Sequence, residues 1–296
     1  MRILSSLVFF LLLVNTTSFA LDTNKIDDLD QWREKAFKLD WKNFEEQSEY
    51  IADIQNVNAT IKIDKEDYYL NNADDIMQFS YWSWGIPDNS NMLLKSDVGY
   101  NLFITSYEDG YVSIDDWKDL DTDEFMKMLN EDAKKEALEK KNKNIEYPLS
   151  YKWVQKPELD RKKNMVFYSY EVFWNDDVPS LQSTSIVLGK KGYTELVFTT
   201  LDLETPFSQL ASIYKSKAET FKYKEGSTYS EYKTGDKVAA VGIGALLATT
   251  LGVKALNPGL LATLGKLLAK FWFIILLPFI FIGKLIDSLK TRKKRR

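Results

Sequence analysis

Carboxylates are the side chains of this sequence that are best suited to catalytic chemistry. The 296 residues include no histidine and no cysteine, which excludes thiol nucleophiles, Cys/His zinc sites and Ser-His-Asp triads. Acid–base chemistry must then use carboxylates, lysine or tyrosine. Two carboxylates held roughly 5–9.5 Å apart in a cleft can hydrolyse a glycosidic bond. The candidates for such a pair are Asp109, Asp115, Asp116 and Glu171.

The densest acidic cluster has part of the pattern of a calcium loop. Asp119, Asp121 and Asp123 have the spacing of its first three ligands. The sixth position is Glu124 instead of glycine, and the twelfth is Asn130 instead of a bidentate glutamate. Acidic residues at a helix start explain the cluster more simply, because they interact favourably with the positive end of the helix dipole. We therefore assign no catalytic, metal-binding or cofactor-binding residue, and we expect no cofactor.

Aromatic residues offer a second kind of site, one that binds a partner without reacting with it. Residues 81–87 read YWSWGIP. This segment predicts either an exposed aromatic patch or a core cluster that is closed by a Gly/Pro turn. Another tyrosine follows a predicted turn at 109–110. The candidate interaction surface is therefore Trp82, Trp84, Asp109 and Tyr111.

Strand-like segments make up much of the region that must position these groups. Residues 59–63 have the alternation typical of a strand, and 100–107 (YNLFITSY) predicts a second strand. The tight turn predicted at Asp109-Gly110 pairs this second strand with 111–114 in a hairpin. Four more strands are expected at 149–156, 164–174, 181–188 and 192–200, with a turn at 157–160. The short loops between these four favour an antiparallel meander.

Helical periodicity is expected in the segments 26–56, 71–78, 121–141 and 204–218. In the third segment, Asp121 and Glu124 form a capping pattern at the start of the helix. The expected apolar faces are Phe125, Met128, Leu129 and Ala133 in the third segment, and Phe207, Leu210, Ile213 and Tyr214 in the fourth. The sequence thus predicts an α+β fold, an antiparallel sheet meander with packed helices.

The N-terminus has the organisation of a secretory signal peptide. Arg2 precedes an apolar run at 3–14, and Ser18-x-Ala20 places small residues before a cleavage site after Ala20. The alternative is an uncleaved anchor. Twelve helical residues reach only about 18 Å, short of a hydrocarbon core of about 30 Å. Residues 1–20 are therefore expected to be a signal peptide, and 21–56 an N-terminal helical region.

The C-terminus contains a candidate transmembrane helix at 267–286. Its centre reads FWFIILLPFIFIG, and twenty helical residues span about 30 Å. Residues 284–296 hold seven basic residues and one acidic residue. A single span places this basic tail, 287–296, in the cytoplasm and satisfies the positive-inside rule. We expect a single-pass inner-membrane protein whose main domain, 57–221, lies in the periplasm or outside.

Charge also restricts the partners of the chain. Residues 21–283 hold 31 basic and 42 acidic residues. An acidic body repels phosphate backbones, so nucleic acid is not expected as a partner. The expected partners are the bilayer and an envelope protein or a second copy of this chain.

A stripe of small residues precedes the expected span. Ala240, Gly244, Ala248 and Gly252 fall four apart and would share one face of a helix at 237–256, after a polar connector at 222–236. Such stripes allow close contact between helices in lipid. The alternatives are self-association or packing against the main span, a helix lying on the membrane surface, and a second span.

Four segments in this order resemble a known family. They are Trp84–Pro87, 104–129 (ITSYEDGYVSIDDWKDLDTDEFMKML), 150–174 and 235–242 (GDKVAAVG). Together they resemble an uncharacterised family of bacterial membrane-anchored proteins, catalogued as domain of unknown function 2167, over about 57–290. The resemblance implies an exported domain with one or more C-terminal membrane segments. It transfers no catalytic residue.

Three functional hypotheses follow from these observations. The first is a membrane-anchored, extracytoplasmic interaction or scaffold module of the bacterial envelope without enzymatic activity. The second is a carboxylate-dependent envelope hydrolase that acts on cell-wall glycans. The third is a pore-like membrane protein in which 238–253 inserts as a second helix.

Overall fold

The computed structural model describes residues 39, 41–43, 49–84, 89–141, 147–200 and 202–252, without the side chains of 49 and 81–84. The compact unit to which they belong ends at Gly252. The expected signal peptide, transmembrane helix and basic tail lie outside the described residues. Within the described ranges, no helix is both long and apolar enough to cross a bilayer.

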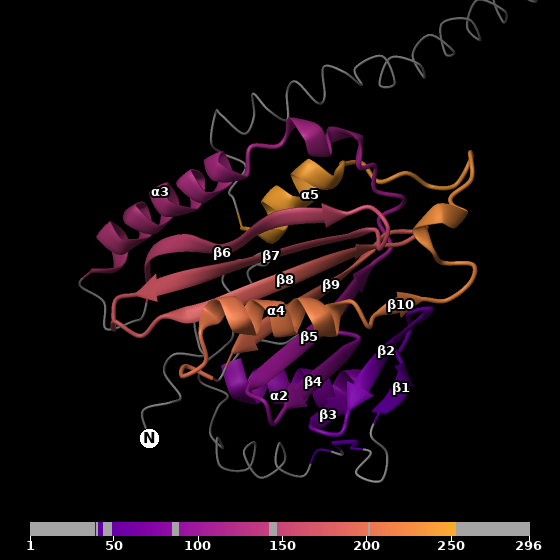
Figure 1. Ribbon diagram of the computed structural model, residues 1–296, viewed down its shortest axis with the longest axis horizontal. Helices are drawn as coiled ribbons and strands as arrows, with labels where there is room; N and C mark the ends of the chain where they lie inside the picture. The colour runs from indigo at the N-terminus through magenta and orange to yellow at the C-terminus, as the bar shows by residue number, and fades with distance from the viewer. Residues whose placement is uncertain are drawn as a thin grey trace, which may run out of the picture. The chain divides into compact units, whose positions relative to one another are not determined.

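A seven-stranded antiparallel sheet forms the centre of the domain (Figure 1). The strands of the expected meander, β6 to β9, are consecutive neighbours, so this prediction is confirmed. The sheet runs in the order β3 (Asp67–Leu70), β4 (Met92–Ser96), β5 (Tyr100–Tyr107), β9 (Tyr193–Thr200), β8 (Ser180–Leu188), β7 (Met165–Trp174), β6 (Pro148–Asp160).

A second antiparallel sheet has three strands, in the order β1 (Glu49–Asp53), β2 (Ala59–Asp64) and β10 (Lys222–Tyr223). The expectation of helix through residue 56 is therefore wrong at its end, because β1 pairs with β2 along its whole length. The connector expected at 222–236 is also more than a linker. It contains β10 and the 3₁₀-helix η3 (Tyr229–Glu231), and the side chain of Tyr229 is buried.

Helices cover both faces of the large sheet. On one face, α4 (Phe207–Ala218) and the three-stranded sheet enclose the main core, which includes Leu102, Phe167 and Tyr214. The other face carries α2 (Ala73–Trp84), α3 (Thr122–Lys140) and α5 (Ile243–Thr250). In Figure 1, α4 and α3 lie on opposite sides of β6 to β9. The α+β prediction is confirmed for this domain.

The start of α3 follows the predicted capping pattern. The Asp121 carboxylate accepts hydrogen bonds from the backbone N–H groups of Asp123 and Glu124, each at 3.0 Å. These bonds satisfy donors that have no partner in the first turn of a helix. The four residues of the predicted apolar face, Phe125, Met128, Leu129 and Ala133, are the buried residues of α3.

The hairpin predicted at Asp109-Gly110 is wrong. Both edges of β5 are occupied, one by β4 and the other by β9, so 111–114 has no position beside it. Instead, Gly110 N–H donates to the Lys191 carbonyl, and Tyr111 forms a parallel bridge with Val238. The local turn signal was therefore overridden by long-range strand pairing.

The turn predicted at 157–160 is also wrong. β6 continues to Asp160, and the chain turns at 161–164, where Asn164 has a φ of 50°. Pro157 is accommodated because β6, at the edge of the sheet, pairs with β7 alone among the described strands and its register shifts between Gln155 and Glu158. Edge strands and bulges are the places where a sheet tolerates proline.

Candidate binding cleft

A cleft of about 490 Å³ opens between α4, the turn that joins β2 to β3 and the β4–β5 turn. Its floor is polar and its mouth combines hydroxyl, amide and apolar side chains. The residues that line it include Lys62, Asp64, Asp67, Ser96, Val98, Tyr100, Gln209, Ser212, Ile213, Ser216 and Lys217.

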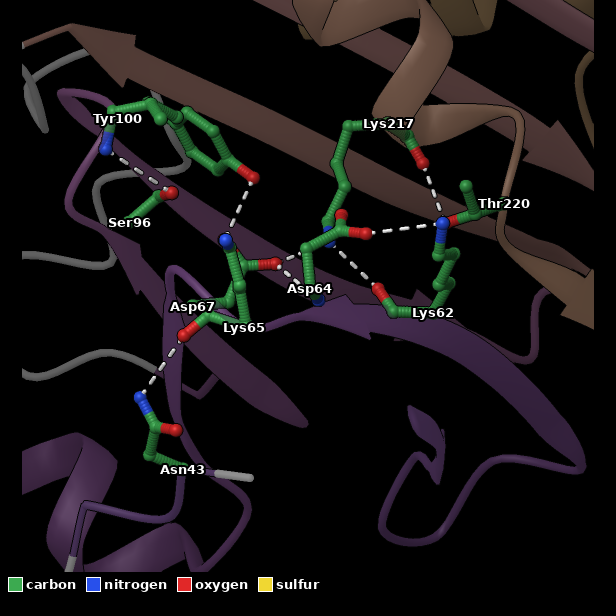
Figure 2. Close-up of polar contacts among 10 residues, drawn as sticks. Asn43, Lys62, Asp64, Lys65, Asp67, Ser96, Tyr100, Lys217 and Thr220 are labelled. Atoms are coloured by element: carbon green, nitrogen blue, oxygen red, sulfur yellow. Dashed lines mark hydrogen bonds and ion pairs between the residues drawn. The ribbon is translucent and has the colours of Figure 1, made fainter. Parts of the chain in front are cut away.

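The floor is built from one row of residues across three strands. Asp67 on β3 lies opposite Ser96 on β4, and Ser96 lies opposite Tyr100 on β5. Residues paired in this way point to the same face of a sheet. The small Ser96 side chain lies between the other two, and the Tyr100 hydroxyl donates to Asp67 Oδ1 at 3.1 Å. Figure 2 shows these side chains together.

Lys217 reaches this row from α4. It lies three residues after Tyr214 and seven after Leu210, so helical periodicity places it on the buried stripe of α4. Its ammonium donates to the Lys62 carbonyl at 2.7 Å, to Asp64 Oδ2 at 2.9 Å and to Asp67 Oδ2 (Figure 2). The side chains of Lys217 and Asp67 are 4% and 1% exposed. They form a buried ion pair.

Further hydrogen bonds and charges surround the ion pair of Lys217 and Asp67. Asp67 Oδ2 also accepts the backbone N–H of Asp64 at 3.0 Å. Burial acts to raise the pKa of the Asp64 carboxyl, but hydrogen bonds and charge attraction from Lys217 and Lys62 outweigh it and hold the pKa below its usual value. Burial and the negative charge of Asp67 raise the pKa of the Tyr100 phenol. The phenol therefore stays neutral and donates to Asp67.

These contacts determine what the cleft can do chemically. All three ammonium protons of Lys217 are used in bonds to protein oxygens, so the lysine is not available as a nucleophile or a general base. Asp67 likewise accepts three hydrogen bonds. The buried pair fixes the walls of the cleft in place. A bound molecule would contact the side chains at its mouth.

The mouth presents both polar and apolar groups. Ser212 and Ser216 donate their hydroxyl protons to carbonyls one turn earlier in α4, which leaves their oxygens as acceptors. Val98 is 52% exposed and Ile213 is 39% exposed. The expectation that Ile213 belongs to the buried face of this helix is therefore wrong, because Lys217 takes part in that face and Ile213 lies at the cleft. Such a mouth offers hydrogen bonds and apolar contact to a bound molecule.

The four carboxylates suspected of hydrolysis do not form one site. Asp109 and Asp115 are exposed, whereas Asp116 is buried and accepts the Gly244 N–H at 3.1 Å. Glu171 belongs to β7, where it lies opposite Lys152. Glu171 points to the α4 face of the large sheet, whereas Asp116 packs with α5 on the other face. In the described residues, no group of acidic side chains has an arrangement that could hold a metal ion.

The candidate interaction residues also belong to separate elements. Trp82 and Trp84 are in α2, and their side chains, like residues 85–88, lie outside the described part of the structure. Asp109 is exposed in the loop after β5. The Tyr111 ring is stacked between Tyr229 and Tyr232, with centroid distances of 4.5 Å and 4.0 Å.

The small-residue stripe is not one helical face. The helix expected over 237–256 begins only at Ile243, because the chain before it forms backbone hydrogen bonds with Tyr111 and Ser113. Ala240 precedes the helix and Gly252 follows it, with a φ of 74°. Gly244 and Ala248 are buried within the domain. A Cβ at Gly244 would lie 2.5 Å from the Leu120 side chain, so this glycine permits close packing of α5 against η2 (Asp115–Asp119).

Lys217 and Asp67 are the residues that sequence reasoning missed. Lysine and aspartate are rarely buried, so neither residue was singled out from the sequence. A signal was nevertheless present, because Lys217 continues the periodicity of Leu210 and Tyr214. Asp67 similarly alternates with Tyr69 in β3. A charged residue at a position that periodicity assigns to the core predicts a buried partner of opposite charge.

Comparison with known proteins identifies the family. No curated protein matches the chain. Among solved structures, the solution structure of cyanobacterial PsbP (CyanoP) from Synechocystis sp. PCC 6803 is similar with a TM-score of 0.36 and 12% identity, covering 60% of this chain and 93% of that one. The family model described as "Protein of unknown function (DUF2167)" matches residues 46–280. Because this match spans most of the chain, the protein belongs to that family, as the four sequence segments predicted.

Proposed function

We propose that this chain is a membrane-anchored, extracytoplasmic binding module that holds a polypeptide partner of the cell envelope in the cleft beside α4. The proposal rests on the way in which the cleft is built. Its walls are fixed by the buried pair of Lys217 and Asp67, while its mouth exposes Val98 and Ile213 beside hydroxyl and amide groups. Apolar contacts surrounded by polar groups are the usual composition of a protein–protein interface.

A polypeptide fits this mouth better than a reacting small molecule. The two charged groups on its floor have their hydrogen-bonding capacity occupied by the protein itself. An extended segment can place apolar side chains against Val98 and Ile213, and its backbone amides can donate to the serine oxygens of α4. The cleft would then provide specificity without any chemical step.

The membrane attachment in this proposal comes from the sequence. The signal peptide at 1–20 exports the domain, the span at 267–286 anchors it, and the basic tail at 287–296 remains in the cytoplasm. The domain therefore lies in the periplasm, attached to the inner membrane by a single pass. Protease treatment of spheroplasts carrying a tag on each end tests this topology. Protection of the domain together with the C-terminal tag would contradict it.

Site-specific crosslinking in intact cells tests the cleft. A photo-reactive amino acid is placed at Val98 or Ile213, with Ile51 as the matched control, because Ile51 is an apolar residue of β1 that is 57% exposed. We expect the same crosslinked polypeptide from both cleft positions and not from the control. A product of identical mass from all three positions, or from none, would argue against the cleft as the binding site.

A further inference from the structure

A short segment before α5 exposes apolar side chains on the outside of the domain. Residues 237–243, which we call the strap, run beside 111–113. Tyr111 N–H donates to the Lys237 carbonyl, Ala239 N–H to the Tyr111 carbonyl and Ile243 N–H to the Ser113 carbonyl, each at 2.9 Å. These bonds fix the backbone of the strap. Val238 and Val241 are nevertheless 53% and 49% exposed.

The surroundings of the two valines have the composition of a bilayer interface. The ring of Tyr111, stacked on Tyr232, is only partly buried, and Lys237 is exposed. Tyrosine is enriched at the level of lipid headgroups, and lysine is common on the polar side of segments that lie there with an apolar side in the membrane. We define the strap face as Val238 and Val241 with the neighbouring rings of Tyr111 and Tyr232.

The charges around the strap face are nearly balanced. The Lys237 ammonium donates to the Glu108 carbonyl at 2.9 Å, and the Asp236 carboxylate pairs with Lys190 at 3.4 Å. Glu108 and Asp109 are exposed next to Tyr111 in sequence. Strong attraction to anionic lipid is therefore not expected. Apolar contact would dominate any association with a membrane surface.

The length of the chain allows this face to reach the bilayer. The strap leads directly into α5, whose eight residues extend about 12 Å. The compact unit ends at Gly252, and the expected span begins at residue 267. Residues 253–266 reach about 21 Å as a helix and at most about 50 Å when fully extended. A short tether also gives a weakly apolar face a high effective concentration at the membrane.

We propose that the strap face rests on the headgroup region of the bilayer in which the chain is anchored, with Val238 and Val241 in contact with lipid. This inference rests on the proposed membrane anchoring. It gives the domain a defined orientation, with the strap and α5 toward the membrane. β1, which lies on the other face of the large sheet, is then directed away from it.

The absence of cysteine from the chain makes a direct test possible. Val238→Cys, Val241→Cys and the control Ile51→Cys are made in the full-length chain, labelled with a small fluorophore and reconstituted in phosphatidylcholine liposomes. Quenching by lipids with a nitroxide near the headgroup is compared with quenching by iodide in water. We expect lipid quenching at the two strap positions to exceed that at Ile51 several-fold, with the opposite order for iodide. The difference should persist at high salt.

Each other outcome is decisive. If the chain floats with the liposomes but all three labels respond alike, the strap face does not contact lipid and only this inference fails. If the strap labels are shielded from both quenchers, a protein surface covers them and the inference fails as well. If the chain does not float with liposomes at all, the proposed anchoring fails and the inference falls with it.

Discussion

Asp67 and Glu195 are carboxylates on opposite faces of the same sheet, and they differ in the hydrogen-bond donors and cations around them. Asp67 is buried on the α4 face with Lys217, Tyr100 and a backbone N–H as donors. Glu195 is mostly buried on the other face, between Thr105 and Ile186 in the register of β5, β9 and β8. Among the residues that the structure describes, the Glu195 carboxylate has no hydrogen bond and no ion pair.

The difference shows that burial alone does not determine the energy of a charged group. Burial raises the pKa of Glu195 to about 7, since no hydrogen bond or ion pair from the described residues compensates for the lost water. At the Asp67 site, the fold supplies a cation and two further donors in fixed positions. Removing one partner from such a pair costs far more than the pair itself contributes, because the remaining charge stays buried.

The largest expected effect comes from breaking the buried pair on one side. Lys217→Met leaves Asp67 without its cation and should reduce the free energy of unfolding by about 3–5 kcal/mol. The double variant Lys217→Met/Asp67→Asn, which removes both charges, should recover at least half of this loss. Urea unfolding of the full-length chain in detergent, followed by tryptophan fluorescence, measures both. A double variant less stable than the single one would show that the two residues do not act as a pair.

A smaller loss is expected from Tyr100→Phe, which deletes the hydroxyl that donates to Asp67 at 3.1 Å. A hydrogen bond to a charged group contributes about 1.5–3 kcal/mol. The same unfolding assay should show a loss in this range. In a background that already carries Lys217→Met/Asp67→Asn, the loss should be less than half as large. Equal losses in both backgrounds would place the effect in packing of the ring and not in the bond to Asp67.

A gain in stability, instead of a loss, is expected from neutralising Glu195. Glu195→Gln should stabilise the protein by about 1–3 kcal/mol at pH 8. The pKa of Glu195 rises from 4.5 to about 7 on folding, so the folded state binds more protons between these values. The contribution of Glu195 to the free energy of unfolding therefore falls as pH rises from 4.5 to 7. The glutamine variant lacks this pH dependence. Unfolding free energies at pH 5 and pH 8 measure it, and a destabilised variant at pH 8 would indicate an ionic partner for Glu195.

The smallest expected effect concerns Asp64, whose side chain is 36% exposed. Its pKa is lowered on folding, so its contribution is present above about pH 4 and is lost as pH falls through the lower folded value. Asp64→Asn should cost at most about 1 kcal/mol at pH 7, because solvent screens an exposed pair. Thermal unfolding at pH 7 and pH 3 should show the two proteins converging at the lower pH. A constant difference would exclude a charge effect.

The sequence by itself determined the elements in which local pattern and tertiary environment agree. The strands expected at 100–107, 164–174 and 181–188 match β5, β7 and β8, and α3 follows from the capping residue Asp121 and an apolar face at helical spacing. The family also followed from four sequence segments, and the match over 46–280 confirms it. In these places the apolar positions that the pattern marks are the positions that the fold buries. The predicted residues and the observed ones therefore coincide.

Only the tertiary structure decided which strands pair and which charged side chains meet. The Asp109-Gly110 turn made no hairpin because β9, more than eighty residues later, occupies the edge of β5. The burial of Lys217 with Asp67 depends on contacts between residues 150 positions apart. Glu195 was left without such a counter-ion among the described residues. Sequence periodicity gives the face on which a side chain lies, but the charge that meets it there is set by chain topology, which no local pattern contains.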